Sequence, residues 1–258
     1  FWIAIAVALV PLAAAPAQSD LPEIRLNTDT TTELQNEEQV AVNPTDPNNV
    51  VACWRDFRLG YRQVGVGTSF DGGTTWTDRL IGGQLPWDSD PALAVHRDGT
   101  FYLVVINYQN GGANQLSVHR STTGGVSWEG PFQAVYSAGD TFEDKEMIAV
   151  DRTGGVRDGY VYIAWSRFYE TRIMCVRSGN RGVTWNSPVP VSDAGRSCQW
   201  PVPIVAAGGS LLVAWCDLNT PRILYDISTN GGTSWGTDRT LTTATTGAGQ
   251  IINGGILV

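Results

Sequence analysis

The stretch SFDGGTTW, residues 69–76, returns three more times along the chain as a serine followed seven residues later by a tryptophan. The other copies are STTGGVSW at 121–128, SGNRGVTW at 178–185 and STNGGTSW at 228–235. The four tryptophans stand 52, 57 and 50 residues apart. A repeat of this length, built from short strands, is typical of radially stacked blades of antiparallel sheet.

The spacing inside each repeat predicts four strands per blade. An apolar run, ending at Trp54, Ile106, Trp165 and Trp215, precedes the turn tryptophan by 20 to 22 residues. No segment shows a sustained helical period. We therefore expect an all-β propeller of four-stranded blades, with about four blades and the start of a fifth.

The last residues bear on how the propeller closes. After the fourth repeat, a further first strand is expected near residue 250, and the sequence ends at residue 258. Four repeats and a partial fifth would leave an open apolar edge, which stable propellers avoid. We therefore expect a chain cut at both ends from a longer propeller, with a closed four-bladed ring as the alternative.

The charge of the chain limits its partners. The formal net charge is −8 and the isoelectric point is about 4.7. No basic face is available to displace counterions from a phosphate backbone, which argues against nucleic-acid binding. The same charge disfavours anionic membranes.

The first 17 residues, FWIAIAVALVPLAAAPA, predict export. The apolar run is too short to span a bilayer, and it has the small-residue ending of a secretory signal peptide. A membrane anchor or a buried strand is the alternative. We expect a signal remnant at 1–17, a lead-in at 18–36 and the propeller at 37–258, in a protein that is secreted, extracellular or periplasmic and not inserted in a membrane after cleavage.

The cysteines and histidines predict no zinc site. Only two histidines are present, and no cysteine–histidine spacing fits a metal cluster. Export makes disulfides possible, and Cys198 and Cys216 lie nearly opposite each other about residue 207, where they could bridge. Cys53 and Cys175 fall in different repeats and are expected to be reduced and buried.

The repeated turn resembles the Asp box, Ser-x-Asp-x-Gly-x-x-Trp, also called the bacterial neuraminidase (BNR) repeat. From Gln39 onward the chain is similar to sialidase-like propellers of the neuraminidase superfamily, which implies a six-bladed ring. Asp boxes also occur in xyloglucanases, sortilin-type receptors and photosystem assembly factors, so the box indicates fold more than activity. We interpret the box as structural, with a polar side chain that caps the turn, glycines at positive φ and a packed tryptophan. The residues given this role are Ser69, Asp71, Gly73, Trp76, Ser121, Gly125, Trp128, Ser178, Trp185, Ser228, Gly232 and Trp235.

The resemblance places the active face where first strands begin and second strands end. Seven carboxylates mark three predicted first-strand starts: Glu37, Glu38, Asp88, Asp90, Glu143, Asp144 and Glu146. Like charges drawn together are unfavourable unless something compensates. Lys145 and nearby arginines are one source of compensation, and a bound calcium ion is the other. No other cofactor is expected.

Known sialidases hold the substrate carboxylate with three arginines and use a tyrosine nucleophile, an assisting glutamate and an aspartate acid/base. The resemblance implies Asp56 as the acid/base candidate and Glu146 or Glu143 as the assisting glutamate. The expected substrate contacts are Arg55, Arg58, Glu38, Asp88, Asp90, Tyr108, Arg167, Tyr169 and Trp200. The first arginine of the family motif is absent, because the sequence there reads EEQV at 37–40. A carboxylate in that place would repel a sugar acid.

These features predict a secreted, sialidase-like protein that acts on or binds glycans, as an exo-glycosidase of the exo-α-sialidase type if it is an enzyme. The alternative is a non-catalytic module that binds carbohydrate or protein, and the missing arginine favours it. A structural repeat within a larger surface protein is a third possibility. Polar strand ends at a channel mouth often only satisfy each other, and fold analogy does not separate these functions.

Overall fold

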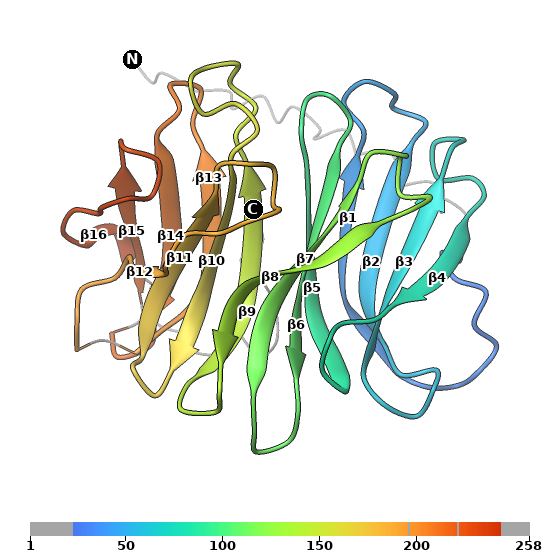
Figure 1. Ribbon diagram of the computed structural model, residues 1–258, viewed down its shortest axis with the longest axis horizontal. Coiled ribbons are helices and arrows are strands. Elements are labelled where there is room, and N and C mark those ends of the chain that lie inside the picture. Colours follow the sequence, from blue (N-terminus) through green and yellow to red (C-terminus); the bar gives the residue numbers. More distant parts are fainter. Residues whose placement is uncertain (1–22, 196, 221, 244–258) are drawn as a thin grey trace, which may run out of the picture.

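The described part of the chain forms sixteen strands in four antiparallel sheets, each with its strands in chain order (Figure 1). The computed structural model describes residues 23–195, 197–220 and 222–243. The predicted all-β architecture of four-stranded blades is confirmed. The predicted signal remnant, at 1–17, lies outside the described residues, as does the expected fifth first strand.

The four sheets are called blades 1 to 4. The strands are β1 (Gln35–Val42), β2 (Val50–Asp56), β3 (Gln63–Ser69) and β4 (Thr77–Ile81) in blade 1; β5 (Trp87–Val95), β6 (Phe101–Tyr108), β7 (Asn114–Ser121) and β8 (Glu129–Ser137) in blade 2; β9 (Phe142–Val150), β10 (Val161–Phe168), β11 (Arg172–Ser178) and β12 (Val189–Pro190) in blade 3; and β13 (Cys198–Val205), β14 (Leu211–Asp217), β15 (Arg222–Ser228) and β16 (Arg239–Thr243) in blade 4.

The blades lie side by side in chain order. β1 packs against β5, β5 against β9 and β9 against β13, and Figure 1 shows the sheets as an arc from blade 1 on the right to blade 4 on the left. In the described part of the chain the arc does not close into a four-bladed ring. The structure describes no helix long and apolar enough to cross a bilayer.

Three hydrophobic cores fill the spaces between neighbouring blades, and this explains why the second strands are apolar on both faces. Along β6, Leu103 belongs to the core shared with blade 1, and Val104 belongs to the core shared with blade 3. Successive strand residues point to opposite faces, so one strand supplies both cores. Trp128, Trp185 and Trp235 each pack at the edge of the core that their blade shares with the preceding one.

The box turns are closed by side-chain hydrogen bonds to backbone amides. Ser69 Oγ accepts from the N–H of Gly73 at 2.9 Å, and Asp71 Oδ1 accepts from the N–H of Thr75 at 2.8 Å. Trp76 Nε1 donates to the Gly73 carbonyl at 2.8 Å. The turn therefore satisfies backbone groups that would otherwise lack partners.

The other three turns repeat these contacts with different residues in the aspartate position. Ser121, Ser178 and Ser228 accept from the glycine four residues on, at 2.9, 2.9 and 2.8 Å. Thr123, Asn180 and Asn230 accept from the amide four residues on, at 2.9, 2.9 and 3.1 Å. The acceptor oxygen is thus kept in every copy, although the charge is not.

Each later turn is also bound to the blade before it. Asn49 donates to the Gly124 carbonyl at 2.9 Å, Arg120 to the Arg181 carbonyl at 3.1 Å, and Arg177 to the Gly231 carbonyl at 3.0 Å. These bonds add to the inter-blade cores and fix the rotation of one blade against the next.

The cysteine register differs from the prediction. Cys198 pairs with Asp217, and Gln199 pairs with Cys216. The two cysteines are therefore one residue out of register, so their side chains face opposite sides of the sheet. Both thiols are free, as are those of Cys53 and Cys175. Burial raises the pKa of Cys175 to about 12, so this thiol stays protonated at neutral pH.

Substituting Gly65 with alanine is expected to destabilise blade 1. A Cβ at Gly65 would lie 2.3 Å from Cε2 of Trp54, a buried side chain with little room to move. The expected loss in the free energy of unfolding is about 1–3 kcal/mol. Gly208→Ala is the matched control, because a Cβ there meets open space. Thermal unfolding followed by circular dichroism compares the two, and equal melting temperatures would contradict the packing described.

The other three box turns predict which residues can replace Asp71. Asp71→Asn is expected to melt near the wild-type temperature, because asparagine accepts the same amide in the third and fourth turns. Asp71→Ala is expected to melt at a lower temperature, because the amide of Thr75 loses its acceptor. A melting temperature for Asp71→Asn as low as that of Asp71→Ala would show that the charge matters, and not the acceptor.

Candidate functional site

Each first strand has a β-bulge near its start, at the end of the blade opposite the box turn. The residue in the bulge is Glu37 in β1, Asp90 in β5, Lys145 in β9 and Trp200 in β13, with φ values of 60°, 49°, 53° and 57°. A non-glycine residue in this left-handed region costs about 1–3 kcal/mol. Bulges re-aim side chains and are frequent beside active sites. The fourfold recurrence therefore marks this end of the propeller as a candidate site.

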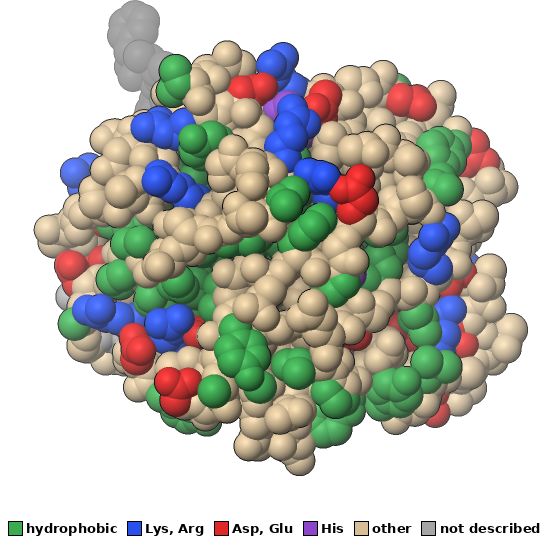
Figure 2. Space-filling model, in the orientation of Figure 1, with side chains coloured by type: hydrophobic (Ala, Val, Ile, Leu, Met, Phe, Trp, Pro, Cys, Tyr) green, Lys and Arg blue, Asp and Glu red, His purple; other side chains and the backbone are tan. Residues whose placement is uncertain are grey.

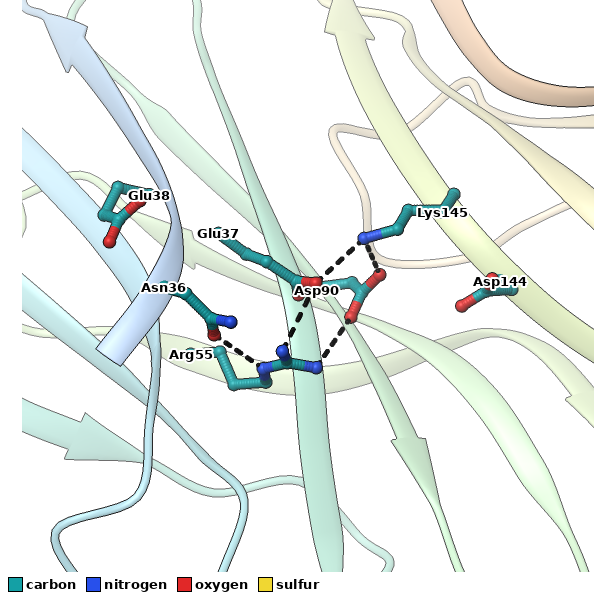
Figure 3. A pocket seen from close by; sticks show the side chains of 7 residues that line it. All are labelled: Asn36, Glu37, Glu38, Arg55, Asp90, Asp144 and Lys145. Atoms are coloured by element: carbon teal, nitrogen blue, oxygen red, sulfur yellow. Dashed lines mark hydrogen bonds and ion pairs between the residues drawn. The ribbon is translucent and has the colours of Figure 1, made fainter. Parts of the chain in front are cut away.

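Three of the four bulge residues line one pocket (Figure 3). The pocket has a volume of about 570 Å³. Its lining comes from the starts of β1, β5 and β9 and the end of β2, and consists of Asn36, Glu37, Glu38, Arg55, Asp90, Asp144 and Lys145.

Lys145 lies between two carboxylates from different blades. Its Nζ is 2.9 Å from Glu37 Oε1 and 2.6 Å from Asp90 Oδ2. Arg55 approaches the same pair more loosely, at 3.6 Å from Glu37 and 3.9 Å from Asp90, and donates to Asn36 Oδ1 at 2.8 Å. Blades 1, 2 and 3 are thus joined at the pocket by one charged network.

The two carboxyl groups of this network differ in their affinity for a proton. Burial, together with the neighbouring Asp90, raises the pKa of Glu37 to about 7. Burial also favours the neutral form of Asp90, but the hydrogen bond with Glu37 and the Lys145 cation outweigh it and lower the pKa of Asp90. Below about pH 7 the pocket therefore holds a carboxylic acid, Glu37, beside a carboxylate, Asp90.

Two more acidic residues from β9 belong to this region. Burial, and then the charge of Asp90, raise the pKa of Asp144 to about 6. Glu146 is 1% exposed, and neither of its carboxyl oxygens has a hydrogen-bond partner among the described residues. Burial raises the pKa of Glu146 well above its usual range. The predicted partner Glu146 is therefore a neutral, buried acid outside the pocket lining.

The predicted acid/base Asp56 is held inside blade 1. Its carboxylate is fully buried, accepts from Trp54 Nε1 at 2.7 Å and pairs with Arg58 at 2.7 Å. Arg58 also pairs with Asp78 at 2.8 Å. Asp56 and Arg58 thus satisfy each other, and neither lines the pocket.

Glu143 has the same type of environment in blade 3. It is fully buried, and it accepts from Trp165 Nε1, from Arg167 Nε at 2.9 Å and from Thr141 Oγ1 at 3.0 Å. Arg167 lies 3.8 Å from Glu170 as well. The predicted residues Glu143 and Arg167 therefore fix strand ends and do not line the pocket.

Asp88 is buried at the start of β5. It accepts from the side chain of Asn107 and from the N–H of Gly83 at 3.2 Å. Burial raises its pKa to about 6. Of the residues predicted to act in catalysis or substrate binding, the pocket thus brings together only Glu38, Arg55 and Asp90.

Aromatic rings form a row on the same face of the molecule. Trp87 packs edge-on against Tyr108 with ring centroids 5.6 Å apart, Tyr108 against Phe142 at 6.0 Å, and Phe142 lies 6.4 Å from Phe168. Tyr108 also accepts from Arg62 at 2.6 Å. Tyr169, which follows Phe168 in the sequence and is a predicted substrate contact, is 77% exposed. The loops from second to third strands carry the exposed apolar side chains of Leu59, Tyr61, Tyr169 and Leu218, and the exposed Phe168 ends β10 just before its loop. These loops lie along the lower edge of Figure 1, where Figure 2 shows hydrophobic side chains.

No group of three or more His, Cys, Asp or Glu side chains among the described residues is arranged to hold a metal ion. Lys145 occupies the position between Glu37 and Asp90 where a cation would compensate their charge. The calcium ion stays a prediction.

Sequence reasoning placed Glu37, Asp144 and Lys145 at the mouth without naming them as catalytic or substrate-binding residues, and it left Asn36 in the lead-in segment. A usable signal was present, because Glu37, Asp90, Lys145 and Trp200 recur at intervals of 53, 55 and 55 residues. The recurrence is hidden in the sequence because no one type of side chain is common to all four positions. They share only a backbone conformation.

Comparison with solved structures supports the fold. A protein of unknown function from Dyadobacter fermentans aligns with a TM-score of 0.59 and 16% identity, over 80% of this chain and 68% of that one. A Hadza microbial sialidase aligns with a TM-score of 0.58 and 15% identity, over 81% of this chain and 46% of that one. The α-L-arabinofuranosidase of Fusarium graminearum, in complex with arabinobiose, aligns with a TM-score of 0.57 and 10% identity, over 79% and 65%.

These alignments show that the chain has a sialidase-like propeller fold, and at such low identity they show the fold alone. The chain spans 46% to 68% of the lengths of these three proteins. No protein-family model matches the sequence, and no curated protein matches it either.

Replacing Lys145 with methionine is expected to destabilise the protein more at pH 8 than at pH 5. The pKa of Glu37 is raised from 4.5 to about 7, so its contribution to stability is complete below about pH 4.5 and is lost as the pH rises through about 7. Without the lysine, the ionised pair has less compensation above pH 7. The expected additional loss at pH 8 is about 1–2 kcal/mol, less than for a fully buried pair because Glu37 is partly open to solvent.

Thermal melts at both pH values, with Lys145→Arg as the variant that keeps the charge, measure this effect. An equal drop at pH 5 and pH 8 would show that Lys145 acts through packing and not through its charge.

Proposed function

We propose that this chain is a glycan-acting propeller whose pocket binds a neutral sugar, with Glu37 as the proton donor to a glycosidic oxygen and Asp90 as the ionised carboxylate beside it. The observation that carries the proposal is the pairing of Glu37 and Asp90 on Lys145 at strained bulges from separate blades. The predicted catalytic pair, Asp56 and Glu146, is replaced in this proposal because neither residue lines the pocket.

The two carboxyl groups suit the two requirements of glycoside cleavage. A carboxylic acid with its pKa raised to about 7 keeps its proton below that pH and can transfer it to the leaving oxygen. An ionised carboxylate stabilises the positive charge that develops on the sugar ring as the bond to the leaving oxygen breaks. Water then bonds to the anomeric carbon, and its proton returns to the Glu37 carboxylate. The hydrogen bond with Glu37 and the Lys145 cation keep Asp90 in its ionised form, and Arg55 adds a looser contact to Asp90 at 3.9 Å.

The charge of the pocket favours a neutral sugar over a sugar acid. Its lining has four acidic residues, Glu37, Glu38, Asp90 and Asp144, against the two cations Arg55 and Lys145. Both cations are already paired with carboxylates. A ligand carboxylate would therefore meet repulsion without a free cation to bind it.

One of the structural relatives supports this substrate class, the α-L-arabinofuranosidase in complex with arabinobiose. The sialidases share the fold but support only the broader class of glycans. An extracellular location, inferred from the apolar first 17 residues, is part of the same proposal, because glycans of this kind lie outside the cell.

A binding module without catalysis is the second candidate. It is favoured by the closed network in which Lys145 and Arg55 bind Glu37 and Asp90, since ion pairs of this kind also serve only to hold strands together. Hydrolysis separates the two candidates, because a binding module retains the glycan without cleaving it.

Replacing Glu37 with glutamine is expected to lower kcat by about 10²- to 10⁴-fold on a neutral glycan substrate, because the proton donor is lost. The wild-type rate is expected to fall as the pH rises through about 7, where Glu37 ionises. The assay screens arabinobiose and other neutral oligosaccharides for release of reducing ends, with 3′-sialyllactose as the anionic comparison.

Glu33→Gln is the matched control, because Glu33 is an exposed glutamate of the lead-in and lies outside the pocket. Cleavage of the sialoside in preference to every neutral sugar would overturn the proposed substrate class. Binding without cleavage would favour the binding module.

A further inference from the structure

The bulge of blade 4 places a tryptophan where the other three blades place charged pocket residues. Trp200 in β13 has φ 57° and lies in the register shift that follows Gln199. Asp90 and Lys145 lie in the corresponding register shifts of blades 2 and 3. β13 packs directly against β9, whose bulge residue is Lys145. Trp200 therefore continues the ring of bulge side chains by one blade, next to the Lys145 side of the pocket.

The backbone conformation of Trp200 costs free energy, and no side-chain hydrogen bond or ring contact among the described residues offsets this cost. A bulky aromatic residue in the left-handed region is an outlier, with a cost of about 1–3 kcal/mol. Trp200 is only half-buried and lies outside the three cores. Among the described residues its indole makes no hydrogen bond and no ring–ring contact. Of the other indoles of blades 3 and 4, Trp165 and Trp215 are fully buried in cores, and the partly buried Trp185 and Trp235 pack against cores.

A half-exposed indole beside a polar pocket suits one ligand chemistry well. A sugar ring has hydroxyl groups around its edge and C–H bonds on its faces. The carboxylates, Lys145 and Asn36 can bind the hydroxyls, while the flat face of an indole can cover the C–H face. A sugar acid has a similar C–H face, but the carboxylates of the pocket repel its charge.

We propose that Trp200 is the stacking platform that holds a neutral sugar ring against the Glu37–Asp90 pair. The inference rests on the proposed function, since it assigns the specificity-determining residue of the same pocket. The strained bulge keeps the indole in place before the ligand arrives, so that little ordering is needed on binding.

The test compares Trp200→Phe and Trp200→Asn with the wild-type chain. An array of neutral oligosaccharides that includes arabinobiose, together with 3′-sialyllactose, identifies the tightest ligand, and calorimetry then measures its Kd. Phenylalanine keeps an aromatic face, and its Kd is expected to stay within about threefold of the wild type. Asparagine accepts the left-handed conformation readily but cannot stack, and its Kd is expected to rise by about tenfold or more.

The melting temperature distinguishes a binding role from a structural one. Trp200→Asn is expected to melt at or above the wild-type temperature, because the strain is relieved. Arg181→Asn is the matched control, because Arg181 has φ 60° in a box turn at the opposite end of blade 3, and its variant should bind sugar as the wild type does.

Each outcome decides the inference. An unchanged Kd in Trp200→Asn would overturn it, whether or not the melting temperature falls, while the proposed function stands. An equal loss of affinity in Trp200→Phe would replace stacking with a bond from the indole N–H. If the wild-type chain binds no neutral glycan on the array, the proposed function fails, and the role of Trp200 fails with it.

Discussion

The left-handed bulge at the start of each first strand is the constraint on which the mouth of this propeller depends. An unbroken strand would direct alternate side chains to the two faces of the blade, into the packing between neighbours. The extra residue turns one side chain per blade out of that alternation. Glu37, Asp90 and Lys145 meet only because each occupies this position in its own blade.

Such strain persists only where the surrounding structure holds it firmly. In blades 2 and 3 the second strands supply two cores at once, so neither of these blades can rotate without opening a core on either side. At the far end, Asn49, Arg120 and Arg177 bind the backbone of the next blade's turn. Inside blades 1 and 3, buried carboxylates bound by a tryptophan and an arginine fix the strand ends beside the bulges. The site thus rests on rigid elements and not on loops.

The repeat was readable from the sequence because its landmarks are chemically alike. The turn tryptophans and the apolar second strands recur with constant spacing, and the structure confirms the blades they predict. The ends of strands were also located correctly as the polar mouth. The sequence could not show which acidic side chains at the strand ends line the pocket and which are enclosed within a blade. Asp56 and Glu143 have the residue types of catalytic acids, yet each is closed off by an indole and an arginine of its own blade.

The central claim is that a neutral sugar lies against the Glu37–Asp90 pair, and a crystal structure of the chain with its tightest neutral oligosaccharide tests it most directly. The account predicts left-handed backbones at all four bulges, a glycosidic oxygen within hydrogen-bonding distance of the Glu37 carboxyl group and a sugar ring against the Trp200 indole. A sugar bound on another surface, without contact to the Glu37–Lys145–Asp90 network, would contradict the account.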